Sequence, residues 1–125
     1  MYIIEILGRI FLSILFLLEG IKKIFNYEDT LEYMQNFNVS GYLLTPAIFV
    51  EILFPILLII GYKTKLSALV LSLFTLTLAI IFHSDFSNQM QFISFFKNIA
   101  IAGGLMIIFV NGPGRLSVDF KLGKK

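Results

Sequence analysis

Four long apolar runs constrain this chain more than any other feature of its sequence. Apart from short connections and a tail at 112–125, the chain consists of them: residues 3–25, 44–62, 66–83 and 95–111. About 20 mostly apolar residues are enough to cross the hydrocarbon core of a bilayer as a helix. Soluble domains are about a quarter charged, whereas this chain is 14% charged and 58% hydrophobic. The sequence therefore predicts an all-α membrane protein in which residues 1–125 form a single domain surrounded by lipid.

The short connections favour antiparallel neighbours, and hence an antiparallel four-helix transmembrane bundle. The longest connection joins the first two runs and contains Asp29 three residues before Glu32, a spacing typical of helix starts. Leu31, Met34 and Phe37 then fall on one helical face. We expect a short interfacial helix between spans 1 and 2; an ordered loop is the alternative.

The basic residues predict an orientation. Loops on the cytoplasmic side of a membrane carry an excess of Lys and Arg. The side of both termini would hold Lys63, Lys65, Arg115, Lys121, Lys124 and Lys125. The opposite side would hold Lys22, Lys23 and Lys97. The sequence thus predicts a multi-pass protein of the cytoplasmic (inner) membrane with both termini in the cytoplasm.

Several function classes are excluded by residues that the chain lacks. Without cysteine, it cannot perform thiol–disulfide exchange or hold an iron–sulfur cluster on thiolates. A single histidine excludes a bis-histidine haem within one chain. His83 has no second histidine or cysteine to complete a metal site, so we expect none. The net charge of +2 is too small to indicate nucleic-acid binding.

Small and polar residues recur at helical spacing in three of the runs. The first has Glu5, Gly8, Arg9, Ser13, Glu19, Gly20 and Lys23; the third has Lys65, Ala68, Ser72, Thr75, Ala79 and His83; the fourth has Lys97, Ala100, Gly104 and Asn111. Small residues let helices approach closely, and hydroxyls bond across them. We expect these faces to meet inside the bundle, with Phe, Leu and Ile toward lipid.

The ionisable residues within the runs need partners, because a charge at the bilayer centre costs at least about 2.5–3.5 kcal/mol. Helical rise places most of them in one half of the bilayer. We expect a cluster in which carboxylates face amines, with an imidazole and an amide at the edge: Glu19, Glu51, Lys22 or Lys23, Lys97, His83 and Asn98. Arg9 stands apart, and we expect it to pair with Glu5 or to extend to the membrane surface.

Pro55 follows Glu51 by four residues and removes the hydrogen bond that the Glu51 carbonyl would accept. A freed carbonyl beside a carboxylate concentrates polarity at one depth, as in a small hydrated or ligand-accepting pocket. The alternative is an ion pair that only fixes the register of the helices. The candidate site residues are Glu19, Lys23, Glu51, Pro55, His83, Lys97 and Asn98.

An ordered set of motifs then becomes informative. They are L-G-R-I-F-L-S-I-L-F-L-L-E-G-I-K-K at 7–23, E-I-L-F at 51–54, G-Y-K-T-K-L-S-A at 61–68, F-T at 74–75, F-H at 82–83, F-F-K-N-I-A-I-A-G-G-L at 95–105 and G-P-G-R-L-S-V-D at 112–119. In this order they resemble the DoxX family of small four-helix membrane proteins. The family has Arg where Lys65 stands, small glycines where Leu53 and Phe54 stand, and often tryptophan near Asp85.

The resemblance implies membrane redox chemistry, since relatives include subunits of thiosulfate:quinone oxidoreductase and membrane partners in oxidative-stress complexes. Our leading hypothesis is a membrane subunit or anchor of a redox complex, with a quinone-type headgroup near Glu51 and electrons from a soluble partner protein. The chain carries no catalytic motif of its own. One alternative is a bundle that passes protons or a small solute. Four helices leave little lumen, so this function would require a homo-oligomer. The other alternative is a non-catalytic scaffold for a partner protein.

Overall fold

The computed structural model describes residues 2–112, 114 and 117–123. Helices joined by short turns account for them, and no strand occurs in these ranges. The four long helices coincide with the apolar runs: α1 (Tyr2–Phe25), α3 (Leu44–Ile60), α4 (Thr64–Phe82) and α5 (Gln89–Asn111). The shorter elements are α2 (Tyr27–Asn36), a 3-10 turn, η1 (Gly41–Leu43), and α6 (Val118–Lys121). The prediction of an all-helical chain is confirmed.

The surface of the long helices is that of a membrane protein. Within the described residues, three segments are suited by length and composition to cross a bilayer: Gly41–Ile60, Thr64–Phe82 and Gln89–Asn111. α1 has 24 residues but carries Glu5, Arg9, Glu19, Lys22 and Lys23. Large apolar side chains such as Phe11 (68% exposed) and Val110 (76%) face outward. Soluble monomers rarely expose so much apolar surface, which here suits lipid. That α1 also crosses stays a prediction.

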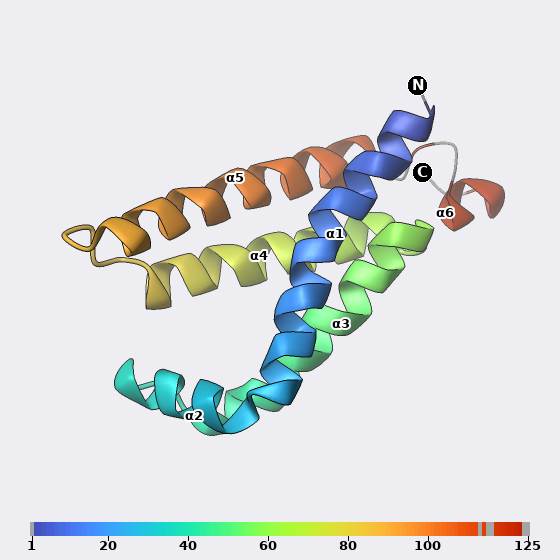
Figure 1. Ribbon diagram of the computed structural model, residues 1–125. Helices are drawn as coiled ribbons and strands as arrows, with labels where there is room; N and C mark the ends of the chain where they lie inside the picture. Colours follow the sequence, from blue (N-terminus) through green and yellow to red (C-terminus); the bar gives the residue numbers. More distant parts are fainter. Residues whose placement is uncertain (1, 113, 115–116, 124–125) are drawn as a thin grey trace.

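The long helices form two pairs (Figure 1). α1 packs along α3 and α4 packs along α5, and within each pair the two helices run in opposite directions. The pairs come together at the end where both termini lie and diverge toward α2. The predicted antiparallel four-helix bundle is therefore seen only in part, because the two pairs diverge at one end.

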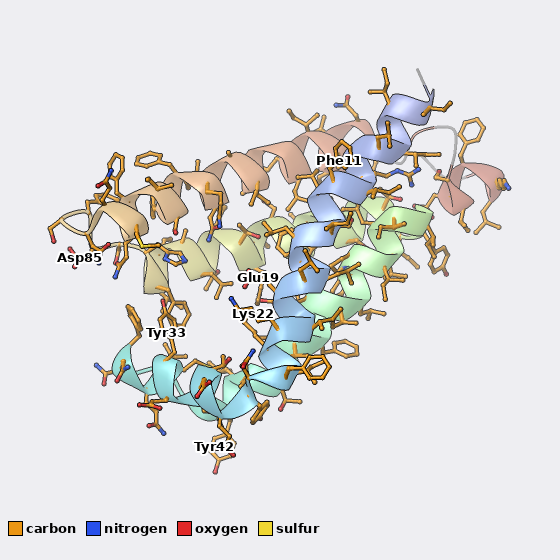
Figure 2. The ribbon with its side chains drawn as sticks, viewed as in Figure 1. Phe11, Glu19, Lys22, Tyr33, Tyr42 and Asp85 are labelled. Atoms are coloured by element: carbon orange, nitrogen blue, oxygen red, sulfur yellow. The ribbon has the colours of Figure 1, made fainter. Side chains whose placement is uncertain are left out.

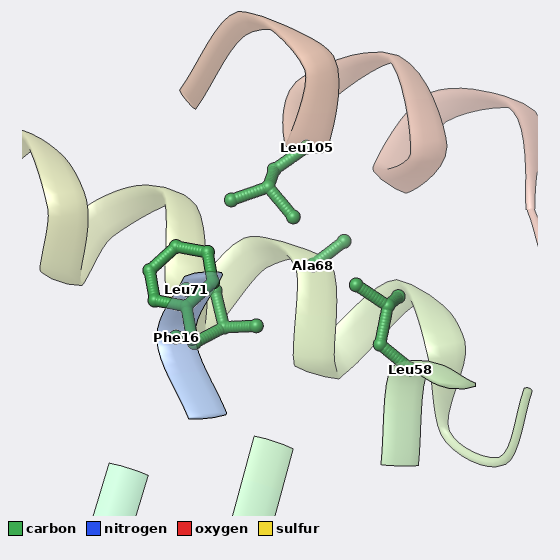
Figure 3. Close-up of a cluster of buried hydrophobic side chains, with 5 residues drawn as sticks. All are labelled: Phe16, Leu58, Ala68, Leu71 and Leu105. Carbon is green, nitrogen blue, oxygen red and sulfur yellow. The ribbon is translucent and has the colours of Figure 1, made fainter. Parts of the chain in front are cut away.

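The apolar core lies where the pairs converge. Every long helix contributes to it: Phe16 from α1, Leu58 from α3, Ala68 and Leu71 from α4, and Leu105 from α5 (Figure 3). All but Phe16 are fully buried. Lipid tails are as apolar as leucine, so this core gains stability from close packing rather than from exclusion of water.

α5 differs from its prediction at its start and on its buried face. It begins at Gln89 rather than near residue 95, because the Asn88 side chain accepts the backbone N–H groups of Met90 and Gln91 and caps the helix. Ala100, predicted to face inward, is exposed, whereas the neighbouring Ala102 is buried. Since α5 packs mainly on α4, only the face carrying Ala102 is covered.

The connection between α1 and α3 contains the predicted short helix. One face of this helix packs against the end of α4. The ring centroid of Phe82 lies 5.4 Å from that of Tyr33 and 5.0 Å from that of Phe37. The helix begins at Tyr27, so Asp29 lies in its first turn and does not cap it. Its position at a membrane interface remains a prediction.

The tail docks on the turn between α3 and α4. The Asp119 carboxylate accepts the backbone N–H groups of Lys63 at 2.9 Å and Thr64 at 2.8 Å, and the Asp119 N–H donates to the Gly61 carbonyl at 2.8 Å. Asp119 therefore satisfies the first donors of α4, which α4 cannot satisfy itself. Sequence reasoning had not assigned this role to the tail, whose residues Arg115, Lys124 and Lys125 lie outside the described ranges.

Arg9 lies beneath this turn rather than at the membrane surface. It is only 3% exposed, and its Nη1 donates to the Leu58 carbonyl at 3.4 Å. Gly61 has a φ of +77°, and a Cβ there would collide with the Arg9 guanidinium. Glu5 and Asp119 lie near enough to stabilise the positive charge. The expectation that Arg9 extends to the surface is wrong, because surrounding protein groups supply the polarity that it needs.

We predict that Asp119→Ala lowers the free energy of unfolding by about 2 kcal/mol, because two N–H groups of α4 lose their acceptor. Unfolding of the purified protein in mild detergent, followed by circular dichroism, measures this. Lys121→Ala, an exposed change in the same tail, is the control. Equal stability of the two variants would contradict the docking of the tail.

Candidate functional site

An ion pair joins the first helix pair near its open end. Lys23 Nζ on α1 lies 2.7 Å from Glu51 Oε1 and 2.9 Å from Oε2 on α3. The side chain of Glu51 is 2% exposed and that of Lys23 is 22% exposed. Close approach of the helices is possible because position 20 is glycine, where a Cβ would lie 2.7 Å from Ile52 Cδ1. The geometry therefore buries a carboxylate only where an ammonium reaches it.

A groove of about 930 Å³ opens beside this ion pair, between the two helix pairs and α2. Figure 2 shows Glu19 and Lys22 on the side of α1 toward α4, and Tyr33 extending from α2 toward the end of α4. Most lining side chains are apolar, such as Leu78 and Ile101. The ionisable and amide side chains of its wall include Glu19, Lys22, Lys23, Asp29, Glu51, His83, Lys97 and Asn98.

The structure brings most of the predicted site residues together in this groove. Glu19, Lys23, Glu51, His83, Lys97 and Asn98 all line it, and Pro55 does not. Pro55 is buried, and α3 continues through it without interruption. Part of the expected pairing is present, since both oxygens of Glu51 bond to Lys23. Within the described ranges, Lys97 has no carboxylate oxygen within 4.0 Å.

Two further groove residues were not among the predicted site residues. Thr75 is 3% exposed, and its hydroxyl has no hydrogen-bond partner in the part of the chain that the structure describes. Sequence reasoning had placed Thr75 only in a stripe of small residues. Burial raises the pKa of the Tyr33 phenol, which thus stays protonated and can donate a hydrogen bond. Tyr33 comes directly before Met34, which belongs to the predicted apolar face of this helix. That position was the signal in the sequence that could have pointed to Tyr33.

The groove ends at the apolar core. Phe16 belongs to the core and also lines the groove, while Val50 and Phe74 line the groove and pack against the core. Beyond the core, a second cavity of about 610 Å³ lies between α1 and α5, beside Arg9 and Gly104. The two cavities share no lining residue. The first is therefore a groove closed at one end, with polar side chains and a mainly apolar wall.

No metal centre is evident in residues 2–112, 114 and 117–123, where no three His, Asp or Glu side chains gather as ligands would. The groove instead matches an amphiphilic molecule. Its apolar side chains suit a hydrocarbon tail, and its amines, amide and hydroxyl suit a polar headgroup.

Exposed apolar helices and a mainly apolar groove that also holds charged side chains define a small helical membrane protein. The chain belongs to the DoxX family, whose family model matches residues 4–84. The model of the SURF4 family matches residues 47–125. The resemblance inferred from the ordered motifs is thus confirmed.

Curated relatives agree with the membrane class. The inner membrane protein YqjF of Escherichia coli is 36% identical over 120 residues, which cover 96% of this chain and 92% of that protein. The inner membrane protein YphA of E. coli is 27% identical, covering 94% and 89%. The Surfeit locus protein 4 homolog of Drosophila melanogaster is 36% identical over 72 residues, covering 51% and 26%. No solved structure matches this chain significantly.

We predict that Lys23→Met destabilises the protein by about 3 kcal/mol, because it leaves the Glu51 carboxylate buried without a partner. Adding Glu51→Leu to the same protein should recover most of this loss, since the uncompensated charge disappears. Unfolding titrations in mixed detergent micelles measure both. Lys22→Met, which removes an exposed neighbouring amine that forms no ion pair with the described residues, should change stability by less than about 0.5 kcal/mol. A Lys23→Met protein as stable as Lys22→Met would contradict the pairing.

Proposed function

We propose that this chain is the membrane subunit of a redox complex and that its groove binds a lipophilic molecule with a quinone-type headgroup. The observation that carries the proposal is the groove itself: a mainly apolar space of about 930 Å³ whose wall holds a buried ion pair and several hydrogen-bond donors. A drug-sized ligand fits a cavity of about 300–1,000 Å³.

The donor set fits such a headgroup. Quinone oxygens accept hydrogen bonds, and the groove offers the ammonium of Lys97, the amide of Asn98 and the hydroxyl of Thr75. The apolar side chains of α3 and α4 suit an isoprenoid tail. Glu19 and His83 line the same groove, and a carboxylate and an imidazole are side chains that commonly serve as general acids and bases. When bound, a quinone would supply two-electron chemistry, with electrons from a soluble partner protein.

The proposal includes the placement of the chain in its membrane. Its two E. coli relatives are inner membrane proteins, and we place this chain in the same kind of membrane as a single DoxX-like domain of residues 1–125. α1 then crosses beside α3. Arg9 is buried and Lys23 pairs with Glu51. Glu19 and Lys22 are exposed but line the groove. The excess of basic residues at the ends places both termini in the cytoplasm, with α2 lying at the opposite interface.

A proton- or solute-passing function is the second candidate, favoured by the row of ionisable side chains in the groove. Its difficulty is the apolar core, where Leu58, Leu71 and Leu105 are fully buried and close the groove. Passage through one copy requires that core to open, or an oligomer with a path between copies. A non-catalytic scaffold is the third candidate. Liposomes containing the purified protein distinguish the second, since proton flux should be absent if the groove only binds a ligand.

We predict that the purified protein in lipid nanodiscs binds a decyl-substituted benzoquinone and that Ala47→Phe weakens this binding by about tenfold, because the ring occupies groove space. Isothermal titration calorimetry gives both affinities. Ala47 lines the groove on α3.

Ala100→Phe is the matched control, since Ala100 is exposed on α5 and lies outside the groove. It should bind the benzoquinone like the unmodified protein. A protein that does not bind the quinone, or two variants that lose affinity equally, would overturn the proposed function.

A further inference from the structure

The geometry points to separate roles for two sets of groove residues. Lys97 and Thr75, on the wall formed by α4 and α5, bind the headgroup. The Lys23–Glu51 pair holds α1 to α3. The ligand class that follows is a neutral amphiphile whose headgroup presents carbonyl oxygens as hydrogen-bond acceptors. This inference rests on the proposed function and assigns the contacts within it.

The ion pair is already engaged. Both oxygens of Glu51 accept from Lys23 Nζ, at 2.7 Å and 2.9 Å, and the glutamate side chain is 2% exposed. A headgroup that took either partner would leave the other charge buried and unpaired, which is strongly unfavourable. The ion pair is therefore unsuited to bind the headgroup of a ligand, and it serves to hold α1 and α3 together.

Lys97 is in the opposite situation. Its side chain lines the groove from α5 and is exposed when the chain is considered alone. No carboxylate of the described residues lies within 4.0 Å of its ammonium. Lys97 lies near enough to His83, another groove residue, for its charge to interact with the imidazole. An ammonium has three donors and no acceptor, and within an apolar helix it gains most from an acceptor oxygen in the groove.

Thr75 supplies an independent observation on the neighbouring helix. The residue lines the groove and is 3% exposed, and its hydroxyl is unpartnered in the described part of the chain. Thr77, on the same helix and also on the groove, donates its hydroxyl to the Leu73 carbonyl at 2.8 Å. The hydroxyl oxygen of Thr75 is buried in this structure. Threonine in helices occupies two χ1 rotamers, and the inference requires the one that turns this hydroxyl into the groove.

The charge of the lining favours a neutral headgroup. Three acidic side chains line the groove, Glu19, Asp29 and Glu51, and three lysines do so, Lys22, Lys23 and Lys97. These charges cancel, so the groove as a whole has no excess of positive charge for a phosphate. Carbonyl oxygens need a donor but no counter-charge, which is what Lys97 and Thr75 offer.

The test compares decylbenzoquinone with decylbenzene, which has the same tail and also a six-membered carbon ring but no carbonyl, by calorimetric titration of the protein in nanodiscs. We expect Lys97→Met to weaken benzoquinone binding by about tenfold or more and to leave decylbenzene binding unchanged. Lys97→Arg, which keeps the charge and the donors, should bind within about threefold of the unmodified protein. Lys65→Met, an exposed lysine of α4 outside the groove, is the control.

Thr75→Val should weaken benzoquinone binding by about fivefold, the effect of one neutral hydrogen bond, while Thr77→Val should not. If the unmodified protein binds the benzoquinone and both Lys97→Met and Thr75→Val bind it equally well, this inference is wrong and the proposed function stands. If decylbenzene binds as tightly as the benzoquinone, the groove binds amphiphiles without reading carbonyls, and the inference is again wrong. If the unmodified protein binds neither, both the inference and the proposed function fail.

Discussion

The need to pair the charged side chains of α1 inside the protein constrains the rest of the structure. Hydrocarbon cannot solvate an ammonium or a carboxylate, so α1 is compatible with a membrane only when its polar face lies against protein. Lys23 reaches Glu51 on α3, and Arg9 reaches the Leu58 carbonyl at the other end of the same helix pair. Two polar contacts, one toward each end, thus fix α1 along α3.

The divergence of the two helix pairs creates the groove. At one end Leu58, Leu71 and Leu105 pack into a core without exposed surface, and Asp119 fastens the tail to the turn between α3 and α4. At the other end α2 contacts α4 through the rings of Tyr33 and Phe37, which pack against Phe82. The space between these two contacts is lined by five helices, α1 to α5, but filled by none of them, which explains why polar and apolar side chains share its wall.

The two family models overlap over residues 47–84, which contain most of α3 and all of α4. These helices connect the two pairs: α3 packs on α1, and α4 packs on α5. The segment recognised by both families is therefore the one that sets the relation between the pairs. Glu51 and Thr75, which line the groove, both belong to this segment.

The sequence by itself determined the membrane class, the number of long helices and most of the candidate residues that line the groove, though not Thr75 or Tyr33. Apolar length and helical periodicity are local properties, and they placed Glu19, Lys23 and Lys97 on faces that border the same groove. Only the tertiary structure decided which amine pairs with Glu51, since Lys23 and Lys97 are equivalent until helix distances are known. The burial of Arg9 and the capping by Asp119 likewise depend on contacts between segments far apart in the chain, which no local pattern encodes.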